Sequence, residues 1–464
     1  MALSIPSSVW SLGADQSRMV RVECGARVGL VVAALLFLLL QARLFAVQTN
    51  YADRIAQAVD GENKCSRSKR ALIDQFSAQQ GKIVALEDER EKLENKNAQL
   101  SVLVGEYRRL GKAAPVLEKQ KPVAAVVIMA CNRPDYLDRT LKSVLKYQQP
   151  IAQKFPLFVS QDGPMESVKA KAKSFVGVEY MQHLEGDPAT RNPGEMVAYY
   201  KIARHYKFAL SELFDVRGFQ KVIILEDDME IAPDFFEYFE ATSTVLDCDK
   251  SVVAVSSWND NGQKQFVSDP EALYRSDFFP GLGWMLTREF WDELSPIWPE
   301  AYWDDWLRLN STRKGRQFIR PEVCRTYNFG EHGSSMGQFY YQYLVPIKLN
   351  DVLVDWKSKD MDMLSEERFN KELARMIATA MPITNLEADG LQMVESVNRD
   401  VSIEYESQSH FERLARKFGV FEEWKDGIPR TSYKGVVVFR WKHKRVFLTR
   451  PDSLEALGWK GDLQ

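Results

Sequence analysis

The sequence predicts an α/β domain with a mainly parallel sheet over residues 122–350. Three observations support this prediction. Short apolar runs alternate with helical patterns, each run ends in polar or charged residues, and the runs are continuous rather than alternating. Continuous apolar runs of this length are typical of strands that are buried on both faces of a parallel sheet. A smaller C-terminal domain is expected over residues 351–464.

The composition indicates a folded protein without the charge of a nucleic-acid binder. The 464 residues are 45% hydrophobic and carry a formal net charge of -3. This apolar fraction suits a packed core, and the lack of a basic excess argues against nucleic acid as a partner. The five cysteines form no CxxC pair, so a zinc or redox motif is unsupported. A Cys248–Cys324 disulfide and buried free thiols both stay open.

An apolar stretch over residues 28–47 predicts a transmembrane helix. A single charge, Arg43, interrupts it near one end, and about 20 such residues are enough for a tilted helix to cross a bilayer. Three arginines precede the stretch, so the positive-inside rule places residues 1–27 in the cytosol and the rest of the chain in the lumen. A cleaved signal peptide is the alternative, but no cleavage site ends the apolar run.

Residues 48–121 predict a helical stem. Apolar side chains recur there at seven-residue spacing with polar interruptions, at Leu72, Leu86, Leu93, Leu100 and Tyr107. This coiled-coil pattern suits a stem that joins two copies of the chain, and it suits a solvated single helix equally well. Prolines at the end of the segment mark the start of the next domain.

Functional groups follow the predicted strands. Residues 123–130, 156–161 and 221–225 are expected to be strands, and Arg133, Asp162 and Asp228 come at or just after their ends. Residues 252–257 predict another strand, and residues 136–147 and 194–214 predict helices. Ligands of open α/β sheets bind beyond the carboxyl ends of the strands. The sequence therefore predicts a binding site at this edge.

Three successive acids, Glu226, Asp227 and Asp228, end the third of these strands. Neighbouring carboxylates repel one another unless a cation offsets their charge. Mn²⁺ or Mg²⁺ prefers such oxygen ligands and also binds the phosphates of a nucleotide. A solvated strand-to-loop turn explains an isolated acidic triplet equally well, so the interpretation depends on the residues around it.

Seven motifs in order resemble the N-acetylglucosaminyltransferase I family. They are MACNRPDYL, FVSQDG, ILEDDMEIAPDFFEYF, SSWNDNG, FFPGLGWML, YWDDWLR and FGEHGSSMGQFY. The resemblance implies a GT-A fold, which is Rossmann-like, UDP-GlcNAc as donor and Mn²⁺ as cofactor. It implies transfer of GlcNAc with inversion, in β1,2 linkage, to the α1,3-linked mannose of the five-mannose N-glycan. It also implies a single-pass type II protein of the Golgi membrane with its catalytic domain in the lumen.

The same resemblance assigns roles to individual residues. Asp304, the first acid of YWDDW, matches the catalytic base, Arg308 would orient it, and Asp228 matches the metal ligand. The remaining matches lie in the donor site: Arg133, Asp162, His205, Glu226, Asp227, Leu282, Trp303 and Ser335. If residues 302–309 are helical, Asp304 and Arg308 share a face and can pair.

Simpler structural roles exist for several of these residues. His205 lies in a predicted amphipathic helix and suits a hydrogen-bonded core histidine, and Trp303 suits a core position. Asp304 suits a helix cap as well as a base, and the residues alone do not distinguish it from Asp305. The chain also departs from the animal members of the family, which place a cysteine where Gly163 stands. The family's disulfide to Cys131 is therefore not carried over, and a non-animal member is indicated.

Two other functions are weighed against this one. A transferase that adds GlcNAc to O-linked mannose is a related enzyme, but that group usually carries an extra sugar-binding domain, for which the stem leaves no room. A non-catalytic glycan-binding Golgi protein is the second alternative, and the intact acids argue against it. In the C-terminal domain, residues 435–441 and 445–448 predict a hairpin. Asn310 begins a glycosylation sequon.

Overall fold

The structure, a computed structural model, describes residues 16–109, 121–334, 337, 339–384 and 390–461. The chain divides into two compact units, residues 1–117 and 118–464. Helix α1 (Gln16–Arg109) is the described part of the first unit, so the predicted stem is helical over residues 48–109. No described helix has a stretch long and apolar enough to cross a membrane. The predicted anchor begins before residue 35, where side chains lie outside the described part of the chain.

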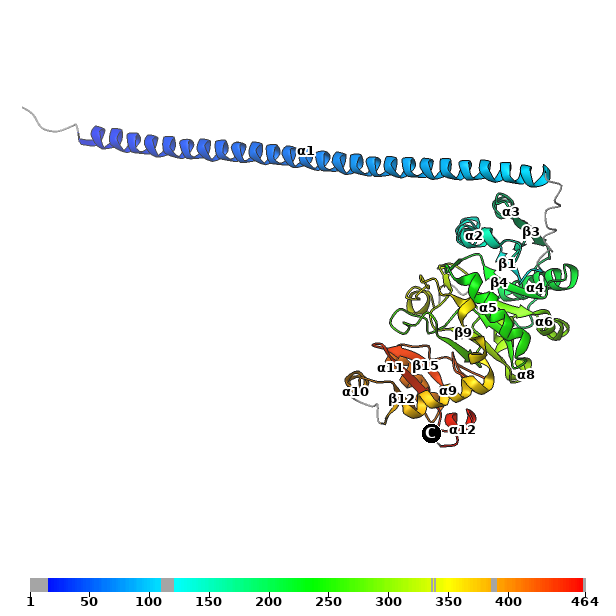
Figure 1. Ribbon diagram of the computed structural model, residues 1–464. Helices are drawn as coiled ribbons and strands as arrows, with labels where there is room; N and C mark the ends of the chain where they lie inside the picture. The colour runs from blue at the N-terminus through cyan, green and yellow to red at the C-terminus, as the bar shows by residue number, and fades with distance from the viewer. Residues whose placement is uncertain (1–15, 110–120, 335–336, 338, 385–389, 462–464) are drawn as a thin grey trace, which may run out of the picture. The chain divides into compact units, whose positions relative to one another are not determined.

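An eight-stranded sheet forms the centre of the second unit (Figure 1), in the order β3-β2-β1-β4-β8-β6-β9-β7. Its strands are β1 (Ala125–Ala130), β2 (Leu157–Asp162), β3 (Val178–His183), β4 (Lys221–Glu226), β6 (Val252–Ser256), β7 (Leu273–Ser276), β8 (Trp284–Thr287) and β9 (Gln317–Pro321). The predicted strands correspond to β1, β2, β4 and β6. A two-stranded ribbon of β5 (Met229–Ile231) and β10 (Thr326–Asn328) follows the acidic triplet.

The sheet is mixed: six of its eight strands run in one direction, with β6 and β9 paired in parallel, so the prediction of a mainly parallel sheet fails only for β7 and β8. Strands β3, β2, β1 and β4 are parallel, but β8 pairs antiparallel with both β4 and β6, and β7 pairs antiparallel with β9. A fully buried strand shows the same apolar run in either direction, so sequence alone does not reveal its orientation. The fold is therefore α/β with a mixed sheet.

Helices cover both faces of the sheet. Alternate side chains of β1 point to opposite faces: Val126 and Ile128 pack in one core cluster, and Val127 and Met129 in another. The helices of this region are α2 (Pro134–Gln148), α3 (Glu166–Lys173), α4 (Val197–Ser211), α5 (Phe235–Cys248), α6 (Arg288–Leu294), α7 (Trp303–Arg308) and α8 (Asn310–Arg313). Side chains of α2 and α5 pack in the first cluster and side chains of α4 in the second.

The C-terminal part builds a second, four-stranded sheet in the order β11-β12-β16-β15 (orange and red in Figure 1). The predicted hairpin is confirmed as β15 (Val437–Trp441) and β16 (Lys444–Thr449), and β11 (Met381–Ile383) and β12 (Val401–Glu404) were not predicted. The other elements are α9 (Glu366–Thr379), α10 (Gly390–Ser396), α11 (Gln408–Phe418), β13 (Trp424–Lys425), β14 (Ile428–Pro429) and α12 (Ser453–Ala456). Tyr433 and Phe447 belong to the same core cluster as Val126, so the two sheets share apolar packing.

The Cys248–Cys324 disulfide is not formed. Cys131, Cys248 and Cys324 are free thiols; Cys248 is exposed at the end of α5. Cys324 is buried, and its sulfur accepts a hydrogen bond from the backbone N–H of Asn259 at 3.2 Å. The alternative of a buried free thiol therefore holds for Cys324.

Candidate functional site

The strand ends meet at one edge of the sheet. Strand β1 lies between β2 and β4, with Ala130 beside Gln161 and Met129 beside Glu226. Asp162 is the last residue of β2 and Glu226 the last of β4. The three strands are parallel, so their carboxyl ends share this edge, as the sequence predicts.

Arg133 connects the end of β1 to the acidic triplet. Its guanidinium Nη2 donates to Asp227 Oδ1 and forms an ion pair with Asp228 Oδ2 at 2.9 Å, and Nη1 donates to the backbone oxygen of His332 at 2.9 Å. Both carboxylates are buried. Burial raises the pKa of Asp227 to about 6, and burial also raises the pKa of Asp228. This cluster therefore combines one cation with two desolvated acids.

Asp228 is also held from the end of β10. Asn328 Nδ2 donates to Asp228 Oδ1 at 3.0 Å, and Asn328 Oδ1 accepts from the backbone N–H of Gly330 at 2.9 Å. A Cβ on Gly330 would lie 2.1 Å from Asp228 Oδ2, so only glycine fits there. Within the described residues, no group of three or more His, Cys, Asp or Glu side chains is arranged to hold a metal ion. A metal at Asp228 would thus need ligands from elsewhere, such as the phosphates of a bound nucleotide.

Glu226 is connected to the helix that carries Asp304. The phenol of Tyr206, on α4, donates to Glu226 Oε1 at 2.9 Å, and its ring stacks on Trp303 with a centroid distance of 4.3 Å. Trp303 is buried, as predicted for a core position, and its ring also stacks on that of Trp284. Burial, and then the charge of Asp228, raises the pKa of Glu226 to about 7. Tyr206 was not predicted, although it directly follows the predicted His205.

Asp304 and Asp305 share one cation. Helix α7 places Arg308 one turn beyond Asp304, and Arg308 Nη1 donates to Asp304 Oδ2 at 3.0 Å and to Asp305 Oδ1 at 2.8 Å. The predicted pairing of Asp304 with Arg308 is thus confirmed. The Asp304 side chain is 40% exposed, whereas that of Arg308 is 9% exposed. An accessible carboxylate on a buried guanidinium has the geometry expected of an oriented base.

A second titratable cluster surrounds Asp162. His183, the last residue of β3, shares a hydrogen bond between its Nδ1 and Asp162 Oδ1 at 2.8 Å, which raises the pKa of His183. Burial opposes ionisation of Asp162, but the contact with His183 holds the Asp162 pKa below its ordinary value. His205 stacks on His183 and shares a hydrogen bond with Ser160 at 2.9 Å; burial lowers the pKa of His205 to about 4. His205 is therefore a neutral, buried histidine. His183 was not predicted, although it ends a strand at the same edge.

Two predicted residues remain, Leu282 and Ser335. Leu282 is partly buried, and its backbone oxygen accepts a hydrogen bond from Thr326 Oγ1 at 2.7 Å. Gly283 has a φ of 85°, and a Cβ there would lie 2.5 Å from Ser257 Oγ, so this turn requires glycine. Ser335 lies outside the described residues.

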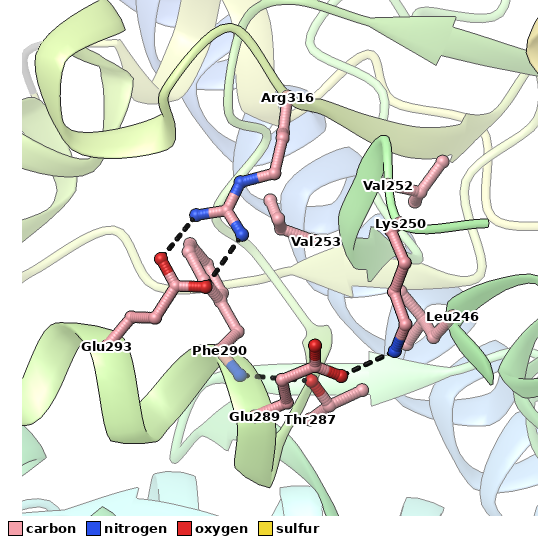
Figure 2. A pocket seen from close by; sticks show the side chains of 9 residues that line it. All are labelled: Leu246, Lys250, Val252, Val253, Thr287, Glu289, Phe290, Glu293 and Arg316. Atoms are coloured by element: carbon pink, nitrogen blue, oxygen red, sulfur yellow. Dashed lines mark hydrogen bonds and ion pairs between the residues drawn. The ribbon is translucent and has the colours of Figure 1, made fainter. Parts of the chain in front are cut away.

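The described cavities contain none of the predicted site residues. Figure 2 shows a cavity of about 40 Å³ between α5, α6 and the sheet, closed by the bidentate pair of Arg316 with Glu293. This volume holds about one water molecule. A groove of about 530 Å³ lies beside β5 and β10, where Glu230 and Tyr327 are part of its lining. The candidate site is thus defined by the strand ends and α7.

The comparisons with known proteins agree with the motifs. Residues 31–460 match the GNT-I family. The alpha-1,3-mannosyl-glycoprotein 2-beta-N-acetylglucosaminyltransferase of Arabidopsis thaliana is 58% identical over 442 residues, which are 95% of this chain and 99% of the relative. Among solved structures, the Pyrobaculum calidifontis mannosyltransferase PcManGT in complex with GDP-Man and Mn²⁺ has a TM-score of 0.29 at 17% identity, covering 49% of this chain and 64% of that one. Residues 1–349 of S. aureus TarS give a TM-score of 0.30 at 12% identity, over 45% and 61%.

The family assignment depends on the first two findings and not on the distant structures. A match across nearly the whole chain, together with a relative that is aligned almost end to end, leaves no large part of either protein unmatched. The chain is a glycosyltransferase and belongs to the GNT-I family.

Proposed function

We propose that the protein transfers GlcNAc from UDP-GlcNAc, with inversion and in β1,2 linkage, to the α1,3-linked mannose of the five-mannose N-glycan, the step that starts hybrid and complex N-glycans. The observation that carries the proposal is the pairing of the accessible Asp304 with the buried Arg308. The stack of Trp303 on Tyr206 connects this pair to Glu226 at the strand ends. The near-complete match to a relative named for this reaction supports the choice of substrates.

The donor would occupy the edge formed by β2, β1 and β4. Arg133 supplies a positive charge toward the diphosphate, and Asp162 a carboxylate toward the uridine. His205 and Ser335 are assigned to the nucleotide as well. Glu226, Asp227, Leu282 and Trp303 are assigned to the remainder of UDP-GlcNAc.

Mn²⁺ is the proposed cofactor, with Asp228 as its protein ligand. The buried, mutually repelling acids fit a hard cation that takes its other ligands from phosphate oxygens. When bound, the ion would neutralise the charge that develops on the departing diphosphate.

Asp304 is the proposed base. Its carboxylate accepts the proton of the acceptor hydroxyl while that oxygen bonds to the anomeric carbon from the face opposite the diphosphate. The carbon–oxygen bond to the diphosphate breaks in the same step, so the configuration inverts. Arg308 keeps this carboxylate oriented, so Arg308 contributes to catalysis by positioning the base and not by transferring a proton.

The proposed setting is the Golgi membrane. Residues 28–47 would anchor a single-pass type II protein with residues 1–27 in the cytosol, and residues 48–121 would form the lumenal stem, either as a homodimer or as a single helix. Residues 122–350 would form the catalytic domain and residues 351–464 the C-terminal domain. The GNT-I match begins at residue 31, within the proposed anchor.

The test uses the full-length protein in mild detergent, with UDP-GlcNAc, Mn²⁺ and the five-mannose N-glycan. We expect one added GlcNAc, loss of transfer with EDTA, and a loss of about 10²-fold or more for Asp304→Asn, the scale of general base catalysis. Asp292→Asn is the matched control, because Asp292 is also an exposed acid four residues from an arginine on a helix. Transfer only to an O-mannosyl peptide, or donor binding without transfer to any acceptor, would contradict the proposal.

A further inference from the structure

A short hairpin of the C-terminal part approaches the helix that carries Asp304. Strands β13 and β14 pair Lys425 with Ile428 across a two-residue turn. The turn residues Asp426 and Gly427 have φ values of 47° and 80°. Positive φ at both positions is the type I′ geometry that suits a tight hairpin, and Asp-Gly is a preferred sequence for it. The turn therefore has a defined shape.

Two side chains of this hairpin contact the junction between α7 and α8. Lys425 Nζ forms an ion pair with Asp305 Oδ2 at 2.8 Å. The backbone N–H of Asn310, the first residue of α8, donates to Asp426 Oδ2 at 3.1 Å. The hairpin thus holds α7 through a side chain and α8 through a backbone group, across a single connecting residue, Leu309.

The rest of the hairpin is fixed by residues around α11 and by Asp260, which follows β6. The ring of Trp424 packs against Tyr405 and Phe411, with centroid distances of 6.0 and 5.7 Å. After β14, Arg430 forms an ion pair with the buried Asp260 at 3.1 Å. A six-residue helix such as α7 is not stable by itself. The position of α7 is therefore set by its contacts with neighbouring segments. The hairpin that supplies some of these contacts is itself held in place by Trp424 and Arg430.

The charges explain why a lysine stands at position 425. A single atom, Arg308 Nη1, donates to both Asp304 and Asp305. Lys425 gives Asp305 a second cation, and the charge of Arg430 also acts on Asp304. Burial opposes ionisation of Asp305, but the hydrogen bond from Lys425 and the charge of Arg308 keep the Asp305 pKa below its ordinary value. Without Lys425, Asp305 would keep only the guanidinium of Arg308, which it shares with Asp304.

We propose that Lys425 is a positioning residue for catalysis: by holding the second oxygen of Asp305, it keeps Asp305 from drawing the shared guanidinium of Arg308 away from Asp304. This inference rests on the proposed function, because it assumes that Asp304 is the base. Lys425 acts through Asp305 and does not touch the reacting atoms. The C-terminal part thereby contributes to the catalytic step as well as to the core.

The test compares Lys425→Met and Lys425→Arg in the full-length protein. We expect Lys425→Met to lower kcat about tenfold, less than the ~10²-fold that a 1 Å misplacement can cost. The KM for UDP-GlcNAc and the melting temperature should not change, and Lys425→Arg should restore most of kcat. Lys442→Met is the matched control: Lys442 also forms a C-terminal ion pair, with Glu395 at 2.8 Å, away from α7.

A double-mutant cycle separates this role from a general effect on folding. If Lys425 acts through Asp305, Lys425→Met combined with Asp305→Asn should lower kcat no more than the stronger single variant. Additive losses, an unchanged kcat in Lys425→Met, or a kcat loss that follows the melting temperature would overturn the inference. An inactive wild-type protein would instead contradict the proposed function, so the two failures are distinguishable.

Discussion

The phenol of Tyr206 donates a hydrogen bond to Glu226 over 2.9 Å. This contact connects helix α4 to the acidic triplet, and the same ring stacks on Trp303 at the start of α7. Tyr206 therefore contacts both the acidic triplet and the helix that carries Asp304. Four predictions follow from this and other contacts of the second unit.

Tyr206→Phe should lower kcat/KM about fivefold to 10²-fold. The variant keeps the stack on Trp303 but leaves the buried Glu226 without its donor, and an unsatisfied buried acceptor costs ~1–3 kcal/mol. Steady-state transfer assays measure the effect, with Tyr341→Phe, an exposed tyrosine, as the control. Equal kcat/KM for Tyr206→Phe and the wild type would show that the hydrogen bond does not support the site.

Gly330→Ala should abolish most Mn²⁺-dependent transfer. The added Cβ would lie 2.1 Å from Asp228 Oδ2 and must displace the proposed metal ligand. Titration of activity with Mn²⁺ should show a higher requirement for the ion. Gly333→Ala is the control three residues away, because its Cβ would have 3.8 Å to the nearest side-chain atom, Arg133 Nη1. An unchanged Mn²⁺ requirement in Gly330→Ala would remove Asp228 as the ligand.

His183→Gln should destabilise the protein more at pH 5.5 than at pH 8.5. The pKa of His183 is higher in the folded protein than in the unfolded chain, so the protonated side chain stabilises the fold at pH values below the unfolded pKa. This stabilisation is lost as the pH rises through the folded pKa. The lowered pKa of Asp162 gives stability above its unfolded pKa, which is lost as the pH falls through the folded value. The pair therefore contributes most between about pH 4 and 6.5, by ~1.5–3 kcal/mol for a charged hydrogen bond.

Urea unfolding of the wild type and His183→Gln at both pH values measures this difference. His410→Gln, a more exposed histidine on α11, is the control. A difference in unfolding free energy that grows with pH would contradict the assigned direction of the shifts.

Asp234→Ala should lower the free energy of unfolding by about 3–5 kcal/mol, the cost of removing one partner of a buried ion pair. Asp234 Oδ2 accepts from Arg325 at 3.0 Å and from Trp356 Nε1 at 2.8 Å, and both charged side chains are fully buried. Denaturant unfolding measures the loss. Asp292→Ala, an exposed acid, should change the unfolding free energy by less than about 1 kcal/mol.

Local patterns in the sequence predicted the strand ends and the ion pair of α7. The acids after β4 follow an apolar run, and the four-residue spacing of Asp304 and Arg308 places both on one helical face. These predictions succeeded because each concerns residues only a few positions apart, and the periodicity of a strand or helix fixes how such residues are placed. Long-range geometry was not predictable: Asn328 lies 100 residues from Asp228, and Asp426 lies 116 residues from Asn310.

The antiparallel strand β8 and the contacts of His183 and Tyr206 were not predicted, because each depends on parts of the chain that are distant in sequence. A buried strand has the same apolar run in both orientations, and a polar residue that ends a strand gains meaning only from the side chain opposite it. The motif resemblance named residues that match a family pattern. Partners from distant parts of the chain, such as Lys425 for Asp305, come only from the fold.

The shared packing of the two sheets sets the boundaries of any useful expression fragment. Tyr433, Phe447 and Leu457 lie in the core cluster that also contains Val126 and Leu225 of the first sheet. A fragment that stops at residue 350 would expose this apolar surface to water and lose the hairpin that holds α7. The smallest fragment that keeps both therefore runs from about residue 118 to beyond Leu457.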